Sequence, residues 1–217
     1  MKDAPGNLAT LADLEALAGR KLNAATLAYF NGGAADEITL RDNIAAWQRL
    51  TLSARVLRPM GGGHTRVSLL GHTLAHPILV APMAHQRLAH PQGERGTALA
   101  AAAQGAGLVL SAQSSTLLED VSRLVRDEAD RGPLWLQLYL QHDRTFIREL
   151  AQRAEAAGYE ALVLTVDAPV SGVRDRERRS GFTLPLGFSP VNLAGRELPP
   201  PVALQPGQSA LFDDLLT

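Results

Sequence analysis

Ile-Leu-Val-Ala-Pro-Met-Ala, residues 78–84, is the first of four short apolar segments that decide the fold of this chain. The other three are residues 108–112, 134–140 and 161–168, so successive segments begin about 26 to 30 residues apart. A stretch with helical periodicity follows each of the first three segments. Regular alternation of strand and helix is typical of parallel strands, which are apolar along their whole length because both faces are buried.

The spacing of apolar residues also predicts the helices. Ahead of the repeats, helices are expected at residues 8–22, 24–30 and 36–50, and a β-hairpin at residues 67–75. Between the strands, helices are expected at residues 93–104, 116–126 and 144–157. Thr116 and Glu119 have the spacing of a capping box for the second of these helices, and Asp143 is the expected cap of the third.

The repeated unit predicts an α/β architecture, the (β/α)8 TIM barrel. Such a barrel needs eight strand-helix units and roughly 250 residues, whereas the pattern here stops after the fourth strand. We therefore interpret residues 1–217 as one incomplete domain. Its parts are an N-terminal helical segment (1–60), the first half of the barrel (61–169) and the long loop that follows the fourth strand (170–217).

Composition excludes several classes of function. The net charge of −1 provides no basic surface for nucleic acid, and the absence of cysteine excludes disulfides and thiolate ligands. The six histidines do not have the spacing of a metal site, and Gly61-Gly62-Gly63 lacks the lysine and helix of a phosphate loop. No apolar run indicates a signal peptide or a membrane span, so a cytoplasmic location is expected.

Polar side chains interrupt the strands near their carboxyl ends, where barrel active sites are built. Ser111, Gln137 and Thr165 come from three successive strands. They have the donors and acceptors to bind the edge of a heteroaromatic ligand. Alternatively, each of them bonds to backbone or water inside the barrel.

Several ordered motifs between residues 8 and 188 resemble the FMN-dependent α-hydroxy-acid oxidase/dehydrogenase family, which includes glycolate oxidase and lactate oxidase. The matching segments are Tyr-Phe-Asn-Gly-Gly-Ala at 29–34, Pro-Ile-Leu-Val-Ala-Pro-Met-Ala at 77–84, Ala-His-Pro-Gln-Gly-Glu at 89–94, Gln-Leu-Tyr at 137–139 and Leu-Thr-Val-Asp-Ala-Pro at 164–169. The resemblance implies FMN as cofactor and covers only the N-terminal half of the family's barrel.

The resemblance also implies roles for individual residues. The turn Ala81, Pro82, Met83 and Ala84 would lie against the flavin, and Ser111, Gln137 and Thr165 would bond to its isoalloxazine ring. Tyr29, Tyr139 and Arg174 would hold the substrate, since a guanidinium binds a carboxylate bidentately. The alternatives are a surface tyrosine at 29, a core aromatic at 139 and a solvated charge at 174.

The implied reaction is oxidation of an L-2-hydroxy acid, lactate- or mandelate-like, to the 2-keto acid, with the flavin reoxidised by oxygen or another acceptor. Ala84 favours an oxidase, and Gln113 replaces a tryptophan that is usual in glycolate oxidases. The family's catalytic histidine lies beyond Thr217, so the other half of the barrel is an expected partner, together with a homo-oligomer, a tetramer by resemblance. Two alternatives are a non-catalytic half-barrel that binds flavin or a partner, and another FMN-binding barrel enzyme.

Overall fold

The computed structural model describes residues 8–140, 143–167 and 172–194, which form two compact units. The first unit takes its described residues from positions 1–56 and 172–185, and the second from 57–171 and 186–217. The end of the fourth apolar segment, at Ala168, and most of the loop that follows it lie outside the described residues.

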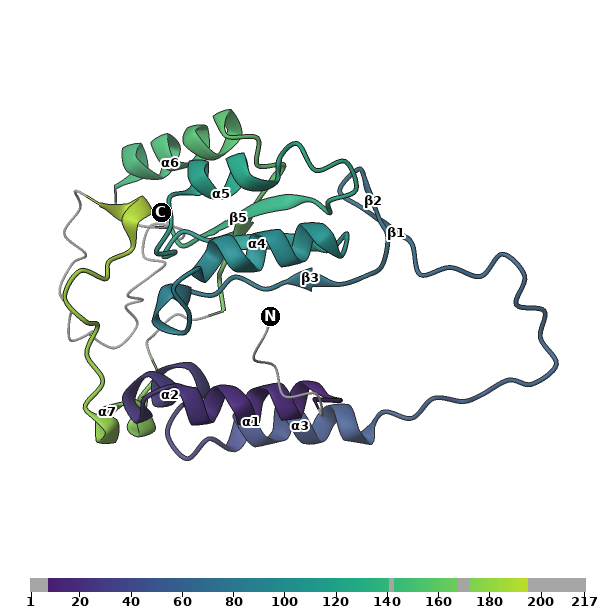
Figure 1. Ribbon diagram of the computed structural model, residues 1–217, viewed down its shortest axis with the longest axis horizontal. Coiled ribbons are helices and arrows are strands. Elements are labelled where there is room, and N and C mark those ends of the chain that lie inside the picture. The colour runs from purple at the N-terminus through teal and green to yellow at the C-terminus, as the bar shows by residue number, and fades with distance from the viewer. Residues whose placement is uncertain (1–7, 141–142, 168–171, 195–217) are drawn as a thin grey trace. The chain divides into compact units, whose positions relative to one another are not determined.

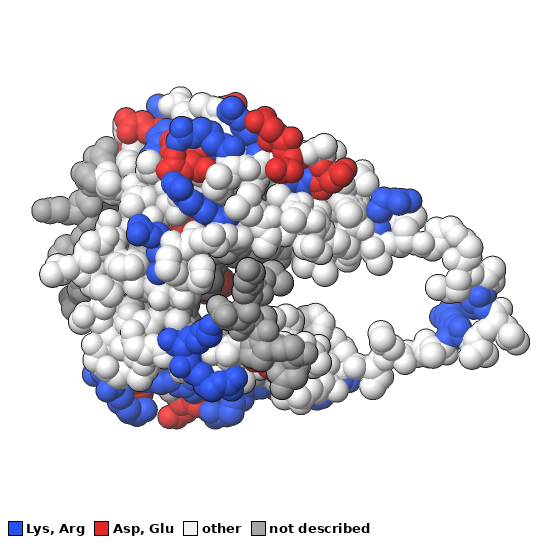
Figure 2. All heavy atoms as spheres, in the orientation of Figure 1, with Lys and Arg blue, Asp and Glu red and all other residues white. Residues whose placement is uncertain are grey.

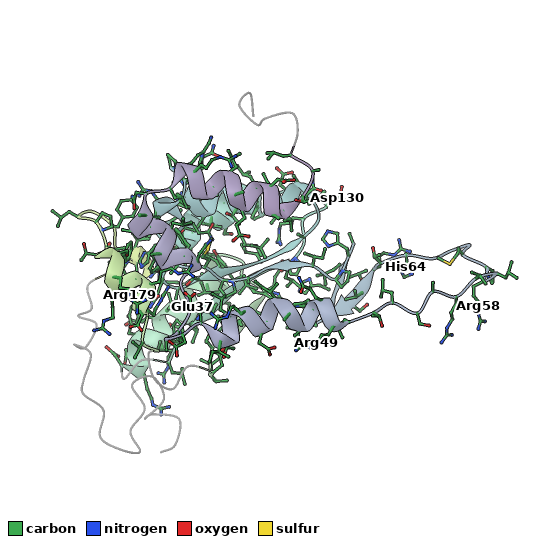
Figure 3. The ribbon with its side chains drawn as sticks, turned by 90° about the horizontal axis from the view of Figure 1, so that it is seen from below. Glu37, Arg49, Arg58, His64, Asp130 and Arg179 are labelled. Atoms are coloured by element: carbon green, nitrogen blue, oxygen red, sulfur yellow. The ribbon has the colours of Figure 1, made fainter. Side chains whose placement is uncertain are left out.

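The first unit is helical. It contains α1 (Leu11–Lys21), α2 (Ala24–Asn31), α3 (Ile38–Arg49) and α7 (Asp175–Ser180), and the first three confirm the helices predicted before the repeats. Helices α2 and α7 lie in contact although about 145 residues separate them, and Arg176 of α7 forms an ion pair with Glu37. Glu37, just before α3, and Arg179, near the end of α7, are labelled in Figure 3.

The second unit begins with an antiparallel hairpin of β1 (Val67–Leu69) and β2 (His72–Leu74). Leu69 pairs with His72, so the two turn residues are Leu70 and Gly71, both with positive φ. The hairpin lies within residues 67–75, where the sequence predicts it. A glycine suits the second position because it adopts this backbone conformation without steric cost.

A four-stranded parallel sheet follows, in the order β3-β4-β5-β6. Its strands are β3 (Leu79–Val80), β4 (Gly107–Ser111), β5 (Leu134–Leu138) and β6 (Ala161–Leu164), one from each apolar segment. Helices α4 (Gly93–Ala103), α5 (Leu118–Val125) and α6 (Arg144–Ala156) connect them and cover one face of the sheet (Figure 1). This arrangement confirms the predicted strand-helix repeat with parallel strands.

The core lies between the sheet and these helices. Leucines at alternate positions of β4 and β5 point toward the helices and are almost fully buried, among them Leu110, Leu136 and Leu138. The register of the strands places these leucines on the same face of the sheet, because Leu136 pairs with Leu110 on one side and with Leu162 on the other. On the outer surface of α5 and α6, acidic and basic side chains are interspersed (Figure 2), for example in the Arg153–Glu119 pair.

Among the residues that the structure describes, the two outer strands of the sheet each have a neighbouring strand on one side only. Leu162 and Leu164 of β6 face the same side as the core leucines, yet they are 49% and 40% exposed. Ile78, next to the opposite outer strand, is 60% exposed. Apolar side chains on an unpaired sheet edge indicate a surface that another element covers.

The segment between α3 and β1 contains no helix or strand. Residues 51–66 are all exposed, and Arg58 and His64 point into solvent along it (Figure 3). Among the described residues, no helix has both the length and the hydropathy that a membrane span requires.

The cap of α6 agrees with the prediction, but that of α5 does not. The Asp143 carboxylate accepts a hydrogen bond from the Phe146 N–H at 2.9 Å, as an N-cap should. At α5 the N-cap is Leu117, and the Thr116 hydroxyl donates instead to Glu94. The Asn192 side chain, 74 residues away in sequence, accepts the bond from the Leu118 N–H. The expected Thr116–Glu119 capping box is therefore wrong, because long-range partners replace it.

Replacing Asp143 by alanine is expected to lower the free energy of unfolding by about 1 kcal/mol, because the first turn of α6 loses its acceptor. Asp143→Asn keeps a side-chain oxygen at the same place and should stay close to wild type. Urea unfolding of the three proteins measures the difference. Equal losses in both variants would show that the carboxylate charge, rather than the cap, is what matters.

Candidate functional site

A cavity of about 580 Å3 lies at the carboxyl ends of the parallel strands, entirely within the second unit. Residues at or just after the end of each of the four strands contribute to it, which is where a barrel carries its site. The lining residues are Pro82, Ala84, Ser111, Gln113, Gln137, Tyr139, Leu164, Thr165, Val166 and Asp167.

Three polar side chains form a hydrogen-bonded chain along one wall of the cavity. The Ser111 hydroxyl donates to Gln137 Oε1 at 3.2 Å, and Gln137 Nε2 donates to the Thr165 hydroxyl at 2.8 Å. Ser111 and Gln137 are almost completely buried and are direct neighbours in the register of β4 and β5. The second Nε2 hydrogen and the remaining lone pairs are left for a bound molecule with donors and acceptors on one edge.

The turn after β3 contributes only part of the stretch that the resemblance singled out. Pro82 and Ala84 line the cavity, whereas Ala81 and Met83 are not among its lining residues. Alternate residues of an extended segment point to opposite sides, and Met83 is accordingly 44% exposed. Side-chain contacts with a molecule in the cavity are therefore available to Pro82 and Ala84.

Tyr139 follows β5 by one residue and lines the cavity with its side chain half-buried. Asp167 and Gln113 line it too. The backbone of Gln113 is fixed by a hydrogen bond, in which its N–H donates to the Ser111 hydroxyl at 3.1 Å.

Tyr29 and Arg174 lie together in the first unit. The Arg174 guanidinium is 5.3 Å from the centre of the Tyr29 ring and donates to the Tyr29 carbonyl oxygen. The Tyr29 ring also stacks on Phe182, with 4.6 Å between ring centres. Arg174 Nε is 3.0 Å from a carboxylate oxygen of Glu177, so its charge has an acidic neighbour. Arg174 is therefore packed and paired rather than a fully solvated loop charge.

The sequence interpretation missed Glu94, which is fully buried at the start of α4. Its carboxylate accepts hydrogen bonds from the Gln86 and Ser115 N–H groups and from the hydroxyls of Ser115 and Thr116. Burial alone would raise the pKa of Glu94, but the hydrogen bonds from Ser115 and Thr116 outweigh it and hold the pKa below the usual value. The sequence does contain an indication that Glu94 is buried, because Glu94 shares a helix face with Ala98 and Ala101, which are apolar and buried.

Lowering the pH is expected to destabilise the protein in two steps. Burial lowers the pKa of His85 from 6.5, with the Glu94 carboxylate partly opposing it, so the unfolded chain binds the proton first and stability falls below about pH 6.5. The lowered pKa of Glu94 gives a stabilising contribution that is present above its ordinary value of 4.5 and is lost as the pH falls through the folded pKa. In Glu94→Gln the second step should be smaller, as measured by urea unfolding between about pH 7 and about pH 3. If the free energy of unfolding fell equally with pH in wild type and in Glu94→Gln, the stabilising contribution assigned to Glu94 would be wrong.

The described residues do not contain a group of three or more histidine and acidic side chains arranged to hold a metal ion. The site features are instead those of a parallel β/α protein with a polar, concave ligand site at the carboxyl ends of its strands.

Comparison with known proteins identifies the family. Residues 18–214 match the model of the FMN-dependent dehydrogenase family, so the chain belongs to that family. It is 46% identical to an L-lactate oxidase of Roseobacter sp. (strain GAI101) over 216 residues, which are 100% of this chain and 57% of the relative. It is 39% identical to 2-hydroxyacid oxidase 2 of Rattus norvegicus, over 82% of this chain and 49% of the relative.

Solved structures give the same result. A mandelate oxidase variant with (S)-mandelic acid superposes with a TM-score of 0.80 at 36% sequence identity, over 86% of this chain and 54% of that one. The chain thus spans about half the length of the relatives that it matches. The fold predicted from the strand-helix repeat is confirmed, and FMN is the cofactor of the family.

Proposed function

We propose that the protein, with its barrel complete, oxidises an L-2-hydroxy acid to the 2-keto acid with FMN as cofactor. The observation that carries the proposal is the hydrogen-bonded chain Ser111–Gln137–Thr165 in a cavity at the strand ends. Family membership and the identity with an L-lactate oxidase support it.

The cavity suits the polar edge of a flavin. Its wall offers hydroxyl and amide groups that both donate and accept, beside the small side chains of Pro82 and Ala84. We propose that Ser111, Gln137 and Thr165 hold the isoalloxazine ring and that the turn from Ala81 to Ala84 lies against it. When bound, FMN supplies the two-electron acceptor that the oxidation requires.

We propose that Tyr29, Tyr139 and Arg174 hold the substrate. Arg174 suits the carboxylate, because a guanidinium forms two parallel hydrogen bonds to it. A tyrosine hydroxyl can donate to the carboxylate or to the hydroxyl that is oxidised. The expected substrates are lactate- or mandelate-like acids, and the relatives named above include a lactate oxidase and a mandelate oxidase. Oxygen or another acceptor would then reoxidise the flavin.

No histidine is among the lining residues of the cavity in the part of the chain that the structure describes. Removing the proton of the substrate hydroxyl requires a positioned base. We propose that the family's histidine fills this role from beyond Thr217, within further β/α units that cover Leu162 and Leu164 and pair with the outer strands. The exposure of these two leucines supports that arrangement. We also propose a cytoplasmic homo-oligomer, a tetramer by family resemblance.

An anaerobic absorption experiment tests the function. FMN is added to the purified protein, excess cofactor is removed, and spectra are recorded before and after L-lactate or L-mandelate. A retained flavin band that bleaches with either acid is the expected result for a complete site. A band that bleaches with neither acid would contradict the proposed oxidation.

The second candidate function is a half-barrel that binds flavin or a partner without catalysis. The composition of the cavity wall favours it, because no histidine is among the lining residues in the part of the chain that the structure describes. The same spectra separate the two functions: a stable flavin band that no 2-hydroxy acid bleaches supports the binding module. The D-enantiomers serve as controls, since only the L-acids should bleach the flavin of an L-specific oxidase.

A further inference from the structure

A buried polar network joins three loops that follow strands β3, β4 and β6. At its centre is the Glu94 carboxylate, which accepts hydrogen bonds from Gln86 in the loop after β3 and from Ser115 and Thr116 in the loop after β4. The Gln86 N–H lies 3.1 Å from it, the Ser115 N–H 2.9 Å and the Thr116 hydroxyl 2.8 Å.

Asn192 extends the network to the segment that follows β6. It is 1% exposed, and its Nδ2 donates to the Ser114 hydroxyl at 2.8 Å and to the Thr116 carbonyl at 3.1 Å. Its Oδ1 accepts from the Leu118 N–H at 2.9 Å. One side chain therefore fixes the segment after β6, the loop after β4 and the start of α5 together.

The network stands directly behind the wall of the cavity. His85 follows the cavity residue Ala84, and its N–H donates to the carbonyl oxygen of Gln113, another lining residue, at 3.3 Å. His85 has a φ of 53°, a conformation that costs energy for a residue other than glycine and persists only where its surroundings impose it. The hydrogen bond from Gln86, the next residue, to Glu94 is one such constraint.

We propose that Glu94 and Asn192 are positioning residues, which hold the loops after β3, β4 and β6 in the arrangement that shapes the FMN cavity. The link to FMN rests on the proposed function. A buried carboxylate would be costly if its only task were to fill space, because an apolar side chain fills space without desolvating a charge. The carboxylate instead accepts directional hydrogen bonds, and its two oxygens thereby fix the positions of two separate loops.

Three variants and one control test the proposal. Glu94→Gln replaces one acceptor oxygen with a donor that faces donors. Asn192→Ala removes the link to the segment after β6, and Thr116→Val removes a single hydroxyl from Glu94 at nearly constant volume. The control is Glu160→Gln, because Glu160 also accepts from a backbone N–H, that of Leu134 at 2.9 Å, but at the amino ends of β5 and β6.

The first measurement is amide hydrogen exchange of the full chain, without FMN. Exchange of peptides covering residues 84–90 and 113–118 should rise about tenfold or more in Glu94→Gln and less in Thr116→Val. In Asn192→Ala the rise should be confined to residues 113–118 and 190–193. Glu160→Gln should leave all these peptides as in wild type. Unchanged exchange in Glu94→Gln and Thr116→Val would overturn the positioning role.

The second measurement is FMN affinity, from the quenching of FMN fluorescence on binding. Glu94→Gln should bind FMN about tenfold more weakly than wild type, with Glu160→Gln within about twofold. Faster exchange with unchanged FMN affinity would overturn the link between the network and the cavity. If the wild-type chain binds no FMN, the proposed binding of the flavin by Ser111, Gln137 and Thr165 of this chain fails, and the exchange data alone still decide whether Glu94 and Asn192 position the loops.

Discussion

Replacing Gln137 by leucine should weaken FMN binding by about 100-fold. Gln137 is the central member of the polar chain, accepting from Ser111 and donating to Thr165. Leucine has a similar volume but leaves both hydroxyls without this partner and removes the amide from the proposed contact with the flavin. Losing the proposed contact of the amide with the flavin, together with the hydrogen bonds that orient the two hydroxyls toward it, is expected to cost about 3 kcal/mol of binding free energy, which corresponds to about two orders of magnitude in affinity.

Fluorescence titration of FMN measures this effect, and Ser122→Ala is the matched control. Ser122 is also buried and hydrogen-bonded, to the Ala157 carbonyl, but it lies on α5 and is not among the cavity residues. Ser122→Ala should lose stability in urea yet keep its FMN affinity. If Gln137→Leu bound FMN as tightly as wild type, the assignment of the polar chain to the flavin would be wrong.

The sequence predicted the parts of the fold that local pattern determines. Apolar strands such as 134–138 alternate with amphipathic helices, and both periods are visible without any contact information. Asp143 was recognisable as a cap because its partner, Phe146, is three residues away. The approximate convergence of Ser111, Gln137 and Thr165 followed from a single rule, that parallel strands bring their carboxyl ends to one edge.

Long-range hydrogen bonds could not be predicted in this way. Thr116 has the spacing of a capping box with Glu119, yet its hydroxyl bonds to Glu94, 22 residues earlier. The cap of α5 comes from Asn192, whose sequence surroundings contain no indication of that partner. Local motifs compete with tertiary contacts for the same donors, and the tertiary contacts prevail here because they also satisfy a buried carboxylate.

The turn after β3 illustrates a finer limit. The resemblance marked four consecutive residues, Ala81 to Ala84, as a unit, and the structure places only Pro82 and Ala84 at the cavity. A motif indicates which segment approaches a ligand, whereas the alternation of side chains along that segment decides which residues touch it.

Arg174→Met should weaken binding of the 2-hydroxy acid by about 30-fold to several thousand-fold, the largest effect expected at the substrate site. Losing one partner of a hydrogen-bonded charge pair costs about 2–5 kcal/mol, and every 1.4 kcal/mol is tenfold in affinity. In Arg174→Lys the charge remains but the planar fork is lost, so an intermediate effect is expected. The KM for the acid, and the affinity for a 2-keto acid followed through the FMN absorbance, measure the change.

Arg178→Met is the control, because Arg178 lies on the same short helix α7 and forms an ion pair with Asp175 of that helix. It removes an equal charge, so any general effect of charge on the anionic acid appears in both variants. Arg174 also donates to the Tyr29 carbonyl, and its loss therefore affects the first unit as well. Urea unfolding of both variants separates that structural contribution from binding. A KM for Arg174→Met within about twofold of that for Arg178→Met, at equal stability, would show that another cation binds the carboxylate and that Arg174 serves to hold Tyr29.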